Sequence, residues 1–144
     1  MHIHFGNERW NQAAAFALRY EVFVLEQEIS LHDEFDKLDT IDRYYFVAYE
    51  GTLAIATIRY QNKDNHTIQP DRFCVRKDYR NRGIGKKLLL LLEDKARNDG
   101  YKCSILSAEK TALPFYKSLH YSVNSEEYLE DGIVCVEMIK KLSS

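Results

Sequence analysis

The sequence predicts a single α/β domain with a mixed α+β sheet. Segments with the alternation of strands and segments with the spacing of helices follow one another along the chain. Their order is strand, helices, three strands, helix, strand, helix and two strands, which is typical of the α/β class. The 144 residues suit one domain, expected to span residues 1–144, and 45% hydrophobic with 29% charged residues is an ordinary globular composition.

The first half of the chain should begin with a strand and a helix. Residues 2–5 alternate in polarity, and Asn7 is a residue type that caps helices. The apolar side of the expected helix carries Trp10, Ala13, Ala14, Ala17 and Leu18. Residues 22–27 fit either the end of this helix or a strand, because β-branched side chains favour strands.

An acidic segment and a hairpin follow. Residues 28–42 carry six acids and few apolar residues, which predicts a loop. Such a segment is usually solvated, but beside a catalytic site it would attract a cationic amine. Residues 43–50 and 52–60 are rich in strand-forming residues and flank Glu50-Gly51, which predicts a hairpin.

The centre of the chain combines a strand, a basic turn and a leucine-rich helix. The strand is expected over 67–75, with an irregularity at Pro70. The turn 76–87 contains six cationic side chains together with Gly83 and Gly85. Glycines let the backbone approach a bound group, and the helix N-terminus favours negative charge, so a phosphate would fit here. The plainer interpretation is a solvated basic turn before a core helix.

Two common nucleotide motifs do not match this turn. A Walker loop requires Ser or Thr after Gly-Lys, and Lys87 follows Gly85-Lys86. A dinucleotide fingerprint requires a third glycine where the chain has Leu88.

The second half of the chain continues the α/β pattern. The helix after Gly83 should bury Ile84, Leu88, Leu91 and Leu92. Leu89 and Leu90 lie off that stripe, which indicates burial on a second side or an interface such as that of a homodimer. The remaining expected elements are a strand over 101–107, a helix over 109–119 and a hairpin over 121–128 and 132–140.

Composition excludes several classes of function. Wholly apolar runs such as Leu88 to Leu92 are far shorter than the ~20 residues that span a bilayer, so we expect no membrane span, and no secretory signal is visible. Three widely spaced cysteines, Cys74, Cys103 and Cys135, are typical of buried thiols in a reducing compartment and form no metal motif. With a net charge of −2, nucleic acid is not an expected partner. We therefore expect a cytoplasmic protein.

Two motifs resemble those of one enzyme family. Arg80-Asn81-Arg82-Gly83-Ile84-Gly85 is similar to the Arg/Gln-x-x-Gly-x-Gly/Ala motif of the GNAT superfamily of acetyl-CoA-dependent N-acetyltransferases. Residues 112–121, which include Phe115-Tyr116, resemble the second signature of that superfamily, a Phe-Tyr helix closing at Gly-Phe, with His120 in place of the glycine. The order of the expected elements is also that of the GNAT fold.

The resemblance implies a coenzyme site. It places the pantetheine arm of acetyl-CoA along Phe73, Cys74 and Val75, whose backbone N–H groups would hold the thioester oxygen as it becomes an oxyanion. The pyrophosphate would lie on Asn81, Arg82, Gly83, Ile84, Gly85 and Lys86, with Arg80 as a peripheral cationic contact.

The resemblance also implies a proton donor. The tyrosine of the family falls on Tyr116, which would protonate the leaving thiolate, whereas the structural alternative is a tyrosine packed in the core. The family's occasional glutamate base falls on Ser104, so no general base is assigned. Asp71, Glu109, a water chain or a neutral substrate remain open.

The front half has a resemblance of its own. Leu18 to Gln27, the acids at 34, 36 and 39, a Tyr at 45 and Arg59 look like small bacterial ElaA-type GNAT proteins and, more distantly, like acyl-homoserine-lactone synthases. This resemblance implies substrate-side roles for Arg19, Glu26, Glu34, Asp36 and Arg59. The expected activity is acetyl transfer to a small-molecule or peptide amine without a metal, and the rival is an acyl-CoA sensor without turnover.

Overall fold

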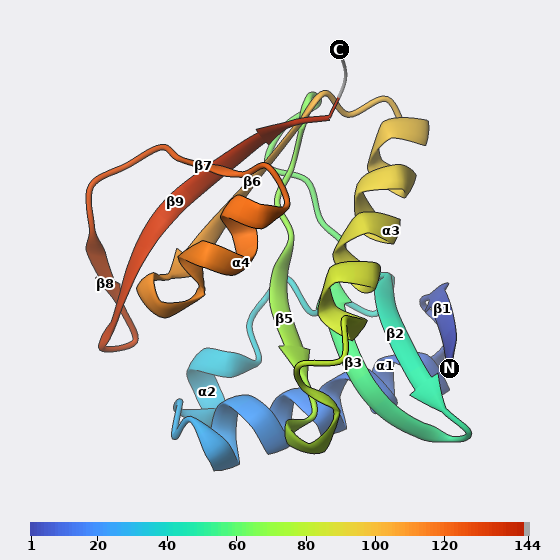
Figure 1. Ribbon diagram of the computed structural model, residues 1–144. Coiled ribbons are helices and arrows are strands. Elements are labelled where there is room, and N and C mark those ends of the chain that lie inside the picture. Colours follow the sequence, from blue (N-terminus) through green and yellow to red (C-terminus); the bar gives the residue numbers. More distant parts are fainter. Residues whose placement is uncertain (143–144) are drawn as a thin grey trace. The chain divides into compact units, whose positions relative to one another are not determined.

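The strands of the protein form two sheets, which belong to two compact units (Figure 1). The computed structural model describes residues 1–142. The first unit consists of Met1–Gln61 with Arg72–Leu92, and the second of Asn62–Asp71 with the residues from Glu93 onward. Each unit therefore draws on segments that are far apart in the sequence.

The sheet of the first unit has the strand order β1-β2-β3-β5. Its strands are β1 (His2–Gly6), β2 (Tyr45–Glu50), β3 (Leu53–Arg59) and β5 (Asp71–Val75). Strands β1, β2 and β3 are antiparallel neighbours, and Gly51 closes the predicted hairpin at a φ of +60°. The alternating sequence therefore predicted this part of the sheet correctly.

Helical segments of the first unit frame this sheet. They are α1 (Arg9–Arg19), the π-helix η1 (Tyr20–Glu26), α2 (Leu31–Glu34), the 3₁₀ turn η2 (Lys77–Tyr79) and the start of α3 (Ile84–Asn98). Residues 22–27 thus continue the first helix, and α2 interrupts the expected loop. The α1 helix packs against β2 and β3.

The buried side of α1 differs from the predicted one. Glu8, not Asn7, occupies the N-cap position, and Trp10 is 56% exposed. Asn11 and Arg19 are instead fully buried. Polar groups can be buried when they are hydrogen-bonded, and the Asn11 amide donates to the carbonyls of Gly6 and Tyr45 at 3.0 and 3.1 Å. Hydrophobic spacing alone was therefore right at Leu18, which is fully buried, and wrong at Trp10, Ala13 and Ala17, which are exposed.

The second unit contains the other sheet, with the path β4-β6-β9-β7 and β8 paired to β9. Its strands are β4 (Thr67–Ile68), β6 (Cys103–Glu109), β7 (Ser122–Val123), β8 (Tyr128–Glu130) and β9 (Ile133–Lys141). In this sheet β4 and β6 pair in parallel, whereas β9 pairs antiparallel with β6, β7 and β8. The helical parts are the end of α3, the 3₁₀ turn η3 (Lys110–Ala112) and α4 (Leu113–Ser118).

The strand predicted over 67–75 is in fact two strands. β4 pairs with β6, whereas β5 neighbours β3 in the other sheet. Pro70 separates them and has no N–H to donate to a ladder. Arg72 adds a second irregularity, a φ of +49°. The chain therefore leaves one sheet and enters the other within a few residues.

The leucine-rich helix α3 is buried on more than one side. Leu88, Leu89 and Leu92 are fully buried, while Leu91 is 36% exposed. The predicted stripe was therefore wrong at Leu91, and Leu89 replaces it. Glu93, in the same helix, is also fully buried, which hydrophobic spacing did not indicate.

Candidate functional site

The basic turn between β5 and α3 has the backbone that an anion site requires. Asn81 and Gly83 have positive φ angles of +62° and +77°, and Gly83 precedes the first residue of α3. The N–H of Lys87 donates to the Gly83 carbonyl at 3.1 Å, which is the first helical hydrogen bond. The N–H groups of the preceding helical residues have no such partner within the helix, so they can bind an anion.

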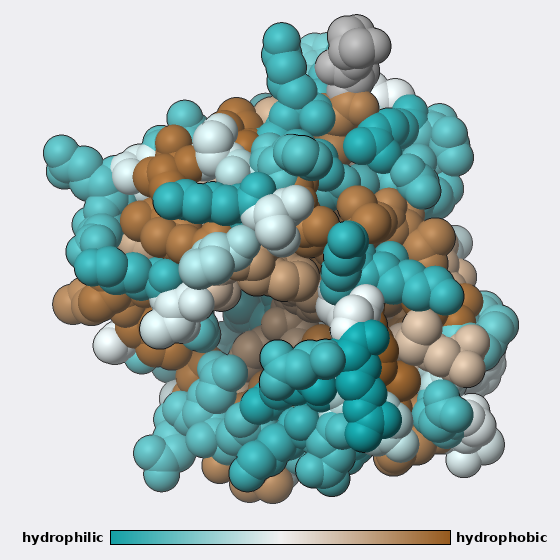
Figure 2. All heavy atoms as spheres, in the orientation of Figure 1, coloured by the Kyte–Doolittle hydropathy of each residue, from teal (hydrophilic) through white to brown (hydrophobic). Residues whose placement is uncertain are grey.

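Exposed cations surround this turn. Asn81, Arg82, Gly83 and Lys86 are all exposed, and Figure 2 shows hydrophilic side chains gathered over α1 and this turn. The Arg82 guanidinium lies 5.0 Å from the centre of the Tyr79 ring. Within residues 1–142, neither Arg82 nor Lys86 forms an ion pair, so both charges are available to a ligand.

Gly85 serves packing as well as backbone approach. A Cβ atom placed on Gly85 would lie 3.1 Å from Cζ of Phe73 and 3.5 Å from Cγ2 of Val75. The first turn of α3 therefore rests directly on two of the three strand residues expected to hold pantetheine. The third, Cys74, points the other way into the core and is 6% exposed. Burial raises the pKa of the Cys74 thiol, which keeps it protonated and unreactive.

Arg80 is held within the protein. Its Nε donates to the Val75 carbonyl at 2.9 Å, and its two terminal nitrogens bond both carboxylate oxygens of Glu26 at 2.6 and 2.8 Å. The hydrogen bond from Arg80 lowers the pKa of Glu26, so the pair is ionised. The guanidinium that was expected to meet phosphate, and the acid that was expected on the substrate side, thus bond each other.

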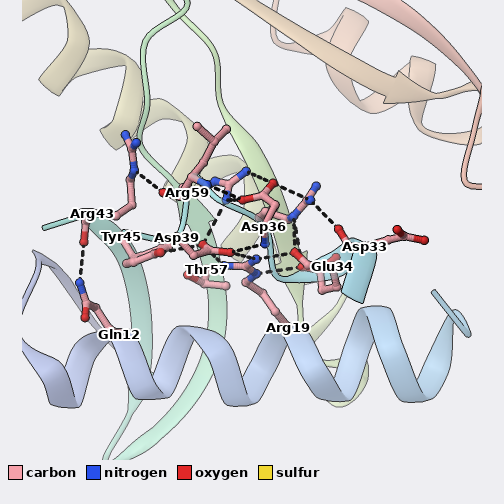
Figure 3. Close-up of polar contacts among 12 residues, drawn as sticks. Gln12, Arg19, Asp33, Glu34, Asp36, Asp39, Arg43, Tyr45, Thr57 and Arg59 are labelled. Carbon is pink, nitrogen blue, oxygen red and sulfur yellow. Dashed lines mark hydrogen bonds and ion pairs between the residues drawn. The ribbon is translucent and has the colours of Figure 1, made fainter. Parts of the chain in front are cut away.

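A largely buried ionic cluster also lies in the first unit (Figure 3). Its members are Arg19, Arg59, Arg72, Glu34, Asp36 and Asp39. Arg19 donates to Glu34 at 2.8 Å and to Asp39 at 2.7 and 2.9 Å. Arg59 donates to Asp36 at 2.7 Å, and Arg72 reaches the same carboxylate at 3.0 Å. The structure therefore brings together Arg19, Glu34, Asp36 and Arg59.

The charges of the ionic cluster balance one another. Burial opposes ionisation of Asp39, but hydrogen bonds from Arg19 and Tyr45 and the nearby charge of Arg59 hold its pKa well below the usual range. Burial raises the pKa of Glu34 despite its hydrogen bond from Arg19. The Tyr45 hydroxyl donates to Asp39 at 2.7 Å, and burial raises its pKa. Three arginines thus face three acids, so the charges of these acids are compensated within the ionic cluster.

Tyr116 lies in the second unit on α4, half-buried. Its ring meets those of Phe115 and Tyr121 edge-on, with centres 5.1 and 5.9 Å apart. Burial, and then the charge of Glu109, raise the pKa of Tyr116, so its hydroxyl stays protonated at neutral pH.

A buried polar network beside Tyr116 escaped the sequence analysis. The Tyr121 hydroxyl lies 2.8 Å from Ser104 Oγ and donates to Glu93 at 2.9 Å, and Lys140 donates to the other oxygen of Glu93 at 2.6 Å. Ser104 is fully buried in this network, so it offers no base. The one available signal was Glu93, an acid continuing a leucine run in α3.

Residues 1–142 contain no group of three or more His, Cys, Asp or Glu side chains arranged to hold a metal ion. None of the helices in this range has the length and apolarity needed to cross a membrane.

Comparison with known proteins identifies the class that this fold and turn define. Residues 13–142 match the family described as Acetyltransferase (GNAT) domain. The chain belongs to this family and is therefore an acyl-CoA-dependent acetyltransferase, as the two motifs predicted.

Individual proteins are similar to this chain over most of its length. The chain is 37% identical over 127 residues to the uncharacterized N-acetyltransferase YjcF of Bacillus subtilis, covering 88% of this chain and 89% of YjcF. A crystal structure from Lactobacillus plantarum has a TM-score of 0.95 at 39% identity and covers 98% of this chain and 97% of that one. Escherichia coli ElaA has the same fold, with a TM-score of 0.87 at 22% identity over 97% of this chain and 99% of ElaA.

Proposed function

We propose that residues 1–144 act as one catalytic domain that moves acetyl from acetyl-CoA to a primary amine. The amine nitrogen attacks the thioester carbon directly, and the tetrahedral intermediate collapses to amide and coenzyme A. The observation that carries this proposal is the turn at Gly83, where positive φ, an open helix N-terminus and two cations that form no ion pair within residues 1–142, Arg82 and Lys86, coincide.

The coenzyme would bind along contiguous parts of the first unit. Asn81, Arg82, Gly83, Ile84, Gly85 and Lys86 would cradle the pyrophosphate, and the backbone of Phe73 to Val75 would hold pantetheine and the thioester oxygen. Contact between Gly85 and the side chains of Phe73 and Val75 supports this assignment, because it makes the strand and the turn one rigid surface. Arg80 is left out of the ligand set because its guanidinium is already bonded.

Tyr116 would assist departure of the thiolate. Its raised pKa keeps the proton in place at neutral pH, which a donor requires. A free thiol has a pKa of about 8.5, below that of this tyrosine, so Tyr116 would protonate the thiolate only while its own oxygen regains the proton that the amine nitrogen releases as the amide forms. The acceptor must arrive neutral or lose its proton to water, because no general base is assigned.

The test is release of free thiol from acetyl-CoA in the presence of a panel of small amines and peptides with free amino groups. Amide product identified by mass spectrometry supports the proposal. Binding of acetyl-CoA without product from any amine would support the rival, a sensor of acyl-CoA. Product only with amino-lactone precursors of the homoserine type would support a synthase-like activity instead.

A further inference from the structure

The π-helix η1 brings two acids to one side of the first unit. Glu21 and Glu26 are five residues apart within Tyr20–Glu26. In an α-helix, residues five apart point about 140° away from each other, at 3.6 residues per turn. In a π-helix the hydrogen bonds run from residue i to i+5, so residues five apart lie about one turn above each other. The N–H of Gln27 donates to the Val22 carbonyl at 3.0 Å in this pattern.

Each of these acids holds an arginine of the basic turn. Glu21 accepts from the Arg76 guanidinium at 2.5 Å, and Glu26 accepts the two-point contact from Arg80 at 2.6 and 2.8 Å. Arg76 stands where β5 ends and Arg80 just after η2, so the contacts hold the turn at both ends.

The same arginines also bond the backbone around the turn. Arg76 donates through its N–H to the Ile55 carbonyl at 2.7 Å and through Nε to the Ala54 carbonyl at 3.0 Å, both in β3. Arg80 donates through Nε to the Val75 carbonyl at 2.9 Å, which closes the loop of chain between them. Every nitrogen of the Arg80 side chain is therefore used inside the protein, and its role here is mechanical.

We infer that Glu21 and Glu26 are positioning residues for the basic turn, where the coenzyme would bind. The π-helical geometry of η1 places both acids against that turn. This inference rests on the proposed function for its ligand. The acids fix the turn before the coenzyme arrives, so less conformational entropy is lost on binding. Neither acid touches the coenzyme.

Electrostatics alone makes the opposite prediction for one variant. Glu26→Gln removes a negative charge from the neighbourhood of a polyanionic ligand, so a simple charge effect would tighten binding. A competing role for Glu26, as an anion that occupies Arg80 until phosphate displaces it, would also tighten binding. Positioning instead requires weaker binding, because the freed Arg80 no longer holds the turn.

The experiment measures acetyl-CoA affinity by calorimetry for wild type, Glu26→Gln, Arg80→Gln and Arg80→Lys. We expect a loss of about 3- to 10-fold in all three variants, the cost of ordering one or two side chains on binding. Arg80→Lys keeps the positive charge but loses the two-point guanidinium contact with Glu26, so its affinity for acetyl-CoA should resemble that of Arg80→Gln. The matched control is Asp94→Asn, which breaks the exposed Asp94–Arg97 pair of 2.8 Å in α3.

A second measurement separates this inference from the proposed function. Hydrogen exchange of the amides in residues 77–85, without any ligand, should quicken in Glu21→Gln and Glu26→Gln and stay unchanged in Asp94→Asn. Melting temperatures should move by less than about 3 °C, because exposed ion pairs contribute little to global stability. If wild type fails to bind acetyl-CoA, the proposed function is lost, and the exchange result still decides the positioning role.

Several outcomes would overturn the inference. Tighter binding by Glu26→Gln would assign it the competing role. Near-normal affinity in Arg80→Lys with a loss in Arg80→Gln would make Arg80 a charge that binds phosphate. Unchanged exchange in the turn would leave both acids as ordinary surface partners. In turnover assays, positioning predicts a raised KM for acetyl-CoA with kcat unchanged at saturation.

Discussion

Replacing Gly83 by aspartate should abolish coenzyme binding, and the structure supplies a matched control. Gly83 has a φ of +77° and Gly132, in the turn of the last hairpin, a φ of +78°. A Cβ atom at either position meets nothing within 4 Å. Gly83→Asp and Gly132→Asp therefore add the same side chain, the same charge and the same backbone strain, and they differ only in location.

The two variants should lose similar amounts of intrinsic stability. A side chain in the left-handed region costs roughly 1–2 kcal/mol, with Asp and Asn at the low end. At Gly83 the new carboxylate also meets the pyrophosphate. Two unit charges 4 Å apart repel by about 1–4 kcal/mol between bulk water and a protein surface, and pyrophosphate carries more than one charge. Affinity for acetyl-CoA should therefore fall by at least tenfold. Because the aspartate side chain also occupies the space of the pyrophosphate, we expect binding too weak to measure.

Thermal melting with and without acetyl-CoA checks this prediction. A ligand at a hundred times its Kd stabilises the native state by about 2.7 kcal/mol, or roughly 5–11 °C for a chain of this size. Wild type and Gly132→Asp should show this shift and Gly83→Asp none. A full shift in Gly83→Asp would refute the placement of phosphate at this turn, and no shift in wild type would remove the coenzyme altogether.

Three further predictions concern Tyr116, Asp39 and His120. Tyr116→Phe should keep the fold and coenzyme affinity but lower kcat and kcat/KM together by about 10²-fold, measured by thiol release; near-normal turnover would return Tyr116 to a packing role. The pKa of Asp39 is lowered by folding, so Asp39 adds stability above its unfolded pKa of about 3.9, which is lost as the pH falls below that value. Denaturant titrations should show this acid slope flattened in Asp39→Asn, with about 3 kcal/mol lost at neutral pH because Arg19 loses a buried partner; an unchanged slope would contradict the assignment. His120 has a φ of +73° after α4, where the family motif has glycine, so His120→Gly should raise the melting temperature by roughly 2–4 °C and His120→Ala should not.

The sequence by itself determined the features that depend on neighbours along the chain. The turn at Gly83 and Gly85 is contiguous, and its positive φ, its cations and the helix after it follow from local residue types. The hairpin at Gly51 was likewise predicted correctly, because alternation is a local property. The order of strands and helices was predicted except that the strands expected over 67–75 and 121–128 are each divided in two, as β4 with β5 and β7 with β8. The family follows from the same local motifs.

Only the tertiary structure decided which partner each charge would find. Arg19 lies 15 residues from Glu34 and 20 from Asp39, and Arg80 lies 54 residues from Glu26. A charged residue in a sequence is predicted to be solvated, and its burial becomes favourable only when the fold supplies an opposite charge at bonding distance. For the same reason Glu93 could not be assigned to Tyr121 and Lys140 from the sequence. Long-range pairing thus buries the carboxylates of Glu34 and Asp39, while most of the acidic segment stays at the surface as the sequence predicted.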